Sequence, residues 1–78
     1  MISIARQGLG SAVVHVPVTD LSNPGAPWQG EGKEEAKQLA LTFMTVNSTW
    51  STGRTEVTRA TLHADAKHYT VLLRHYTS

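Results

Sequence analysis

The chain has 78 residues and no cysteine, and its seven Lys and Arg residues nearly balance its six Asp and Glu residues, which leaves a net charge of +1. This composition excludes disulfides, thiolate metal sites, a strongly basic nucleic-acid binder and a strongly acidic DNA mimic. No apolar run approaches the roughly 20 residues of a membrane span, and the N-terminus lacks the basic-then-apolar order of a signal peptide. We therefore expect one cytoplasmic domain over residues 1–78, without a membrane partner.

Two strands are predicted at the start of the chain, over residues 2–6 and 11–18. The loop between them contains Gly8 and Gly10, which can adopt the positive φ that tight turns need. Pro17 cannot donate to a β-ladder, so the second strand should have an edge there. Because side chains alternate along a strand, one face of this strand carries Ala12, Val14, Val16 and Val18, and the other carries Ser11, Val13, His15 and Pro17.

A single helix is predicted over residues 33–46, after an irregular stretch at 20–32. Glu31, Glu34 and Glu35 lie near its start, where the helix dipole favours negative charge. Trp28 and Trp50 flank it, and we expect each to pack over one end of the core. Apolar side chains recur at the spacing of a helix face that packs on a core: Ala36, Leu39, Ala40, Phe43 and Met44.

Residues 54–64 and 68–76 are rich in strand-forming residue types and predict a β-hairpin with Asp65 and Ala66 at its tip. This register gives an inner apolar face with the pairs Leu62–Tyr69, Ala60–Val71 and Thr58–Leu73. The outer face then has the pairs His63–His68, Thr61–Thr70, Arg59–Leu72 and Val57–Arg74. A shift of one residue would mix polar and apolar groups, so this register is preferred.

The element order is strand, strand, helix, strand, strand. One amphipathic helix can cover one face of a four-stranded antiparallel sheet, so we predict an α+β fold, a two-layer sandwich of order ββαββ. Nothing in the predicted elements remains to cover the second face of the sheet. The order of the strands within the sheet stays open, because sequential hairpins can be arranged in more than one way.

The uncovered face of the second hairpin is the predicted contact surface. Arg and Tyr are favoured at protein interfaces, so a protein partner or a second copy of the chain suits its composition. Nucleic acid is disfavoured, because only Tyr76 is available to stack on bases. The predicted partner-binding residues are Arg59, His63, His68, Leu72, Arg74 and Tyr76.

Three other kinds of site fit the sequence less well. Gly30-Glu31-Gly32-Lys33 lacks the residues on both sides that a phosphate loop requires. His63 and His68 could share a zinc ion, but a third ligand would have to come from His15 or Asp65, and a solvated strand end is the simpler interpretation. No nucleophile elbow or carboxylate pair marks a catalytic centre. We therefore predict no enzymatic activity, no metal and no cofactor.

Residues 24–36 resemble a segment of HicB-type antitoxins, which place three short motifs at this spacing between a strand hairpin and a helix. The motifs are Pro24-Gly25, Gln29-Gly30 and Glu34-Glu35-Ala36. This chain has Glu31-Gly32 where that family has an Asp-Thr capping pair, and a full hairpin follows its helix in place of a shorter ending. The resemblance implies a ββα topology and a domain that caps a toxin RNase.

The whole chain is also similar in style to small phage-encoded anti-CRISPR proteins. Several of these are single cysteine-free domains with one helix, of the Glu35-Ala36-Lys37…Ala40 type, packed on an antiparallel sheet. The resemblance implies a non-enzymatic inhibitor that binds a CRISPR-Cas effector complex in the host cytoplasm and blocks it sterically. The alternatives are the HicB-like antitoxin domain and a homodimeric structural or nucleic-acid-binding module.

Overall fold

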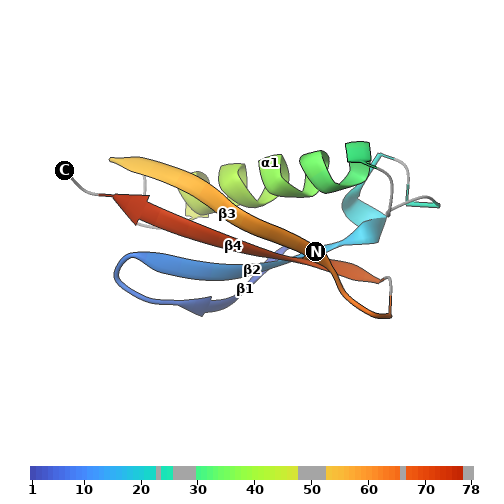
Figure 1. The fold of residues 1–78 in the computed structure, drawn as a ribbon, viewed down its shortest axis with the longest axis horizontal. Coiled ribbons are helices and arrows are strands. Elements are labelled where there is room, and N and C mark those ends of the chain that lie inside the picture. The colour runs from blue at the N-terminus through green and yellow to red at the C-terminus, as the bar shows by residue number, and fades with distance from the viewer. Residues whose placement is uncertain (23, 26–29, 48–52, 66, 77–78) are drawn as a thin grey trace.

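The structure, a computed structural model, describes residues 1–22, 24–25, 30–47, 53–65 and 67–76 (Figure 1). It confirms the predicted α+β fold, with one helix and a four-stranded antiparallel sheet in the order ββαββ. The strands and helices are β1 (Ser3–Gln7), β2 (Ser11–Pro17), a short 3-10 helix η1 (Val18–Asp20), α1 (Gly30–Asn47), β3 (Arg54–Leu62) and β4 (His68–Tyr76).

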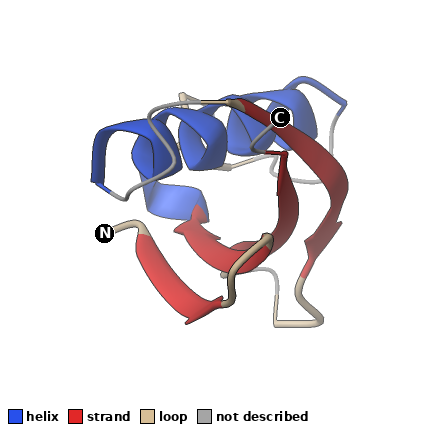
Figure 2. Cartoon of the chain, turned by 90° about the vertical axis from the view of Figure 1, so that its left-hand side faces the viewer, coloured by secondary structure: helices blue, strands red, loops and turns tan. Residues whose placement is uncertain are grey.

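The strand order in the sheet is β1-β2-β4-β3, so β2 and β4 are the central strands and β1 and β3 the edges. Each hairpin keeps its own strands together, and the two hairpins meet where β2 pairs antiparallel with β4. Helix α1 lies along one face of the sheet, and the sheet curves beneath it (Figures 1 and 2). No described helix or strand covers the opposite face, which we call the outer face.

The core lies between α1 and the inner face of the sheet. Ala36, Ala40 and Met44 are fully buried, as the helical spacing predicted, while Leu39 and Phe43 are partly buried against the same core. The two alanines leave room for the helix to approach the central strands closely. The strands contribute the alternating residues of β2 and β4: Ala12, Val14, Val16, Tyr69, Val71 and Leu73.

The register of the second hairpin is as predicted near the turn and shifted further along. Leu62 pairs with Tyr69 and Arg59 with Leu72, but a β-bulge follows at Thr58, so Val57 pairs with Leu73. The predicted pairs Thr58–Leu73 and Val57–Arg74 are therefore wrong. The bulge moves Val57 from the outer face to the core and leaves Thr58 exposed, with its hydroxyl donating to the Leu72 carbonyl at 3.2 Å. The bulge is favourable because it buries Val57, which is more apolar than Thr58.

The first hairpin also contains a bulge, between Ile4 and Arg6, which returns Ile4 to the core side and Arg6 to the outer face. Its loop closes with a hydrogen bond from the Gly8 N–H to the Ser11 carbonyl at 2.8 Å. Contrary to the prediction, neither Gly8 nor Gly10 adopts a positive φ. The expected edge at Pro17 is present on one side, because the β1 pairing of β2 stops at His15.

The two tryptophans, Trp28 and Trp50, lie outside the described residues, and so does part of the segment that resembles HicB-type antitoxins. Within the described part of the chain, no helix is long and apolar enough to cross a membrane.

Candidate partner-binding face

The strand register sets which side chains are neighbours on the outer face. Val13 of β2, Leu72 of β4 and Arg59 of β3 form one row across the sheet, and Arg6 of β1 pairs with Val13 at its other end. Arg74 lies in the adjacent row. The centre of the face is therefore a pair of half-buried aliphatic side chains with exposed arginines around it.

A shallow hollow of about 370 Å³ marks this centre. Its lining includes Arg6, Ser11, Val13, Thr58, Leu72 and Arg74. None of the described residues that line it is acidic, so the hollow combines an apolar floor with positive charge at its rim. We call it the central hollow.

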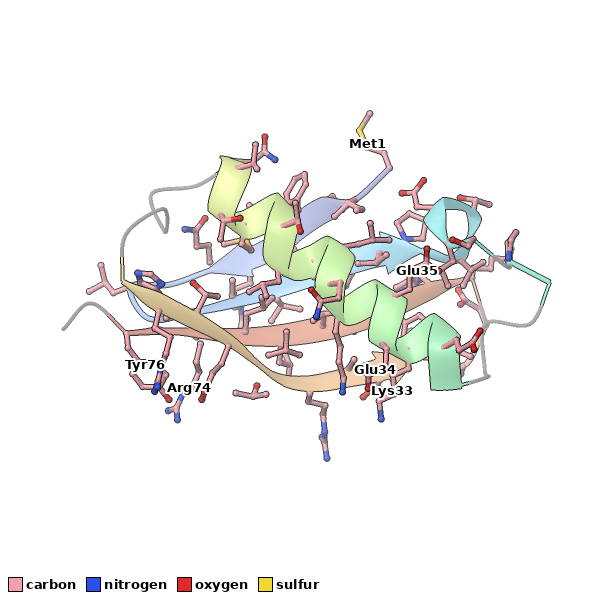
Figure 3. All side chains as sticks on the ribbon, turned by 90° about the horizontal axis from the view of Figure 1, so that it is seen from above. Met1, Lys33, Glu34, Glu35, Arg74 and Tyr76 are labelled. Atoms are coloured by element: carbon pink, nitrogen blue, oxygen red, sulfur yellow. The ribbon has the colours of Figure 1, made fainter. Side chains whose placement is uncertain are left out.

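The structure divides the six predicted partner-binding residues into three groups. Arg59, Leu72 and Arg74 lie in neighbouring rows at the middle of the outer face. His63 and His68 lie together at the turn end of the hairpin. Tyr76 lies at the other end of β4, close to Arg74 and far from Lys33 in the first turn of α1 (Figure 3). The six residues thus share a face without forming one compact patch.

The histidines belong to a larger cluster. The rings of His63 and His68 stack with centroids 4.6 Å apart, and the ring of His15 lies 4.7 Å from that of His68. Asp65 approaches both hairpin histidines, with its Oδ1 3.3 Å from the Nδ1 of His63 and 3.9 Å from the Nδ1 of His68. We call these four residues the hairpin-end cluster.

Asp65 is held in its ionised form. The backbone N–H of Lys67 donates to Asp65 Oδ1 at 2.8 Å, and this hydrogen bond, with a smaller contribution from His63 and His68, lowers the pKa of the carboxyl below its ordinary value of 3.8. A carboxylate beside two imidazole rings can bind a cation, and it can also bind the rings themselves when they are protonated.

Tyr76 interacts with its own strand neighbours. The Arg54 guanidinium lies over its ring, 5.1 Å from the centroid, and its hydroxyl donates to Glu56 Oε1 at 3.1 Å. One face of the ring is therefore occupied by a cation. This arrangement reduces the area of Tyr76 that is free to stack on a base or to enter a pocket of a partner.

Sequence reasoning missed Arg6 and Val13 as members of this face. A signal for Val13 was present, since the alternation of β2 placed it opposite the buried valines. Arg6 had no such signal, because its position depends on the bulge in β1 and on the pairing of β2 with β4.

A second hollow, of about 500 Å³, lies between the first half of α1 and the free edge of β3. Lys33, Lys37 and Arg59 line it, together with strand residues around Thr58. Lys37 is partly neutralised by Glu34, whose Oε1 lies 3.2 Å from its Nζ. We call this hollow the edge groove, and Thr58 is common to it and to the central hollow.

Comparison of the chain with protein-family models, with curated proteins and with solved structures found no match.

Proposed function

We propose that this protein is a non-catalytic binding protein that docks the outer face of its sheet on an acidic surface of a protein partner. The observation that carries the proposal is the central hollow, in which Val13 and Leu72 form an apolar floor between Arg6 and Arg74. Protein interfaces combine an apolar centre with arginines that make charge-assisted hydrogen bonds to carboxylates. The side chains of this hollow offer contact and charge, and no nucleophile beside a base.

Nucleic acid suits the face less well than protein. Proteins that bind single strands stack bases on exposed aromatic rings. Apart from the histidines, Tyr76 is the aromatic residue among the described residues of the outer face. Arg54 already lies over its ring. An aliphatic floor of Val13 and Leu72 favours burial against apolar protein groups instead.

A second copy of the same chain also suits the face less well. A twofold dimer through the central hollow would bring two arginine-lined surfaces together. Like charges that lose water in this way oppose association. An acidic partner removes this cost, which is why we propose a different protein in place of a homodimer.

The specific form of the proposal is an inhibitor of the anti-CRISPR type, which occupies a surface of a CRISPR-Cas effector complex and excludes nucleic acid or nuclease from it. Its support is the architecture: one helix and one sheet face build the core, and the remaining sheet face is left for contact (Figure 2). The arginines of the outer face would contact an acidic part of such a complex, and steric block needs no catalysis. Such an inhibitor acts in the host cytoplasm.

Co-purification tests the identity of the partner. The protein is immobilised and exposed to lysate of a bacterium that carries a CRISPR-Cas system, and retained proteins are identified by mass spectrometry. Recovery of effector subunits in fixed stoichiometry is the expected result. Recovery of a small basic RNase would show that the protein is a HicB-like antitoxin and not a CRISPR inhibitor. A salt-resistant dimer with no retained protein would overturn the proposal of a different protein as partner.

A further inference from the structure

The hairpin-end cluster brings together three side chains that can bind a metal ion. His63, Asp65 and His68 each place one potential ligand atom within 4.8 Å of the other two. His63 directly follows β3, Asp65 lies in the turn and His68 is the first residue of β4, so the hairpin register itself creates the grouping. The sequence showed the two histidines as neighbours, but it did not show that Asp65 points at both of them.

The distances are close to those of a coordination sphere. Nitrogen and oxygen ligands lie about 2.0–2.2 Å from zinc, so two corners of a tetrahedron are separated by roughly 3.3–3.6 Å. The separation of Asp65 Oδ1 from His63 Nδ1 is 3.3 Å, and from His68 Nδ1 it is 3.9 Å. All three ligand atoms lie within 4.8 Å of one another and the two rings are stacked at an interplanar angle of 21°, so both rings must turn toward Asp65 to complete the coordination. The side chains are 53%, 42% and 24% exposed for His63, Asp65 and His68, so an ion can reach them and they are free to adjust.

The surrounding backbone holds the ligands in place. The His63 N–H donates to the His68 carbonyl at 2.9 Å, which fixes the two histidines across the hairpin. The Lys67 N–H orients the Asp65 carboxylate, in the way that outer hydrogen bonds orient metal ligands. Two described backbone hydrogen bonds reach the ligand atoms: the Lys67 N–H donates to Asp65 Oδ1 at 2.8 Å, and the Asp65 N–H donates to His63 Nδ1 at 3.4 Å. A metal ion would replace the longer of the two.

We propose that His63, Asp65 and His68 form a binding site for a divalent transition-metal ion of the zinc type. Two imidazole nitrogens and one carboxylate oxygen suit Zn²⁺, Ni²⁺ or Cu²⁺, whereas Mg²⁺ and Ca²⁺ require mostly oxygen ligands. The ring of His15 beside His68 can supply a fourth ligand, or a water can. Bound metal would hold together the turn end of the hairpin in a chain that has no cysteine to form a cross-link, and would stabilise the folded state by mass action.

Calorimetric titration of tag-free protein with ZnCl₂ tests the site. We expect one ion per chain, a rise in the melting temperature with Zn²⁺, and no response to MgCl₂. Asp65→Asn keeps an acceptor for the Lys67 N–H and should fold normally, yet it should weaken binding by at least the roughly 10- to 100-fold that loss of an outer-sphere partner costs. His63→Ala and His68→Ala should do the same.

Glu56→Gln is the matched control, because it removes a carboxylate from β3 away from the turn, opposite Arg74. It should bind Zn²⁺ like the unmodified protein. The Co²⁺ complex should show the visible bands of tetrahedral coordination, and these should be lost in Asp65→Asn. Absence of zinc binding, or binding that all three substitutions leave unchanged, would overturn the proposal.

Discussion

The Glu35 carboxylate accepts the backbone N–H of Ser22 at 2.9 Å and the Ser22 hydroxyl at 2.6 Å. These hydrogen bonds join the chain just after η1 to the first half of α1, across thirteen residues of sequence. The neighbouring Glu34 has a different role, since its ion pair with Lys37 is local to the helix. Figure 3 shows the two carboxylates projecting from the helix in different directions.

Glu35→Ala is therefore expected to lower the urea midpoint of unfolding, because it removes the described side-chain hydrogen bonds between these two segments. Hydrogen exchange of the Ser22 amide should become faster at the same time. Glu34→Ala is the control, because an exposed pair at this spacing contributes little. If both substitutions lowered the urea midpoint equally, Glu35 would contribute only through its negative charge near the start of the helix and not through its hydrogen bonds to Ser22.

Acid should weaken the fold through the same group. The hydrogen bonds from Ser22 lower the pKa of Glu35 from its ordinary value of 4.5, and the Lys67 N–H lowers the pKa of Asp65 in the same direction. A depressed folded-state pKa gives stability that is present above the unfolded-state value and is lost as pH falls through the folded-state value. Urea unfolding at a series of pH values should show this loss below about pH 4.5, with a shallower slope in Glu35→Gln. An unchanged slope would contradict the role assigned to Glu35.

Among the described glycines, Gly53 occupies a position that does not tolerate a side chain. Its φ is +86°, and an added Cβ would collide with the Tyr76 carbonyl oxygen and crowd the His75 ring. Gly53→Ala should cost about 1–2 kcal/mol or more. Gly8→Ala should be close to neutral, because its Cβ would meet only Ser11 at ordinary contact distances. Thermal unfolding of the two variants checks the difference, and similar melting temperatures would contradict it.

The bulge at Thr58 places two adjacent residues in opposite environments. Val57 packs against the core and Thr58 is exposed, so Val57→Asp should destabilise the fold by about 1–3 kcal/mol, and Thr58→Asp should be tolerated. Chemical denaturation of both variants distinguishes this register from a regular one. A regular hairpin would give the reverse order of stability.

The spacing of particular residues explains why the sequence predicted the whole fold but only part of the outer face. The buried valines of β2 and the alanine-rich stripe of α1 have regular spacings, and burial imposes those spacings directly. The bulges at Ala5 and Thr58 leave no such trace, because Thr58 and Val57 both suit a strand and the choice between them is made by packing against α1.

The composition of the outer face depended on those bulges and on the strand order. Arg59 and Leu72 were paired correctly because they lie on the turn side of the bulge. Arg6 entered the face through the bulge in β1 and through the pairing of β2 with β4, and the sequence left that arrangement open. The approach of Asp65 to two histidines depended on the conformation of the turn.

Two double variants with the same change in charge distinguish binding through the outer face from binding through the edge groove. Arg6→Glu with Arg74→Glu reverses the charge of the central hollow. Lys33→Glu with Lys37→Glu makes the same change in the edge groove. Arg59 lines the edge groove and lies in the outer-face row, so it is left unchanged in both.

Retention of purified CRISPR effector complex on each immobilised variant is the measurement, with circular dichroism confirming that both variants fold. We expect the arginine variant to lose the complex and the lysine variant to retain it as the unmodified protein does. Retention of the complex by the arginine variant would contradict binding through the outer face, and loss by the lysine variant alone would place the contact at the edge of β3.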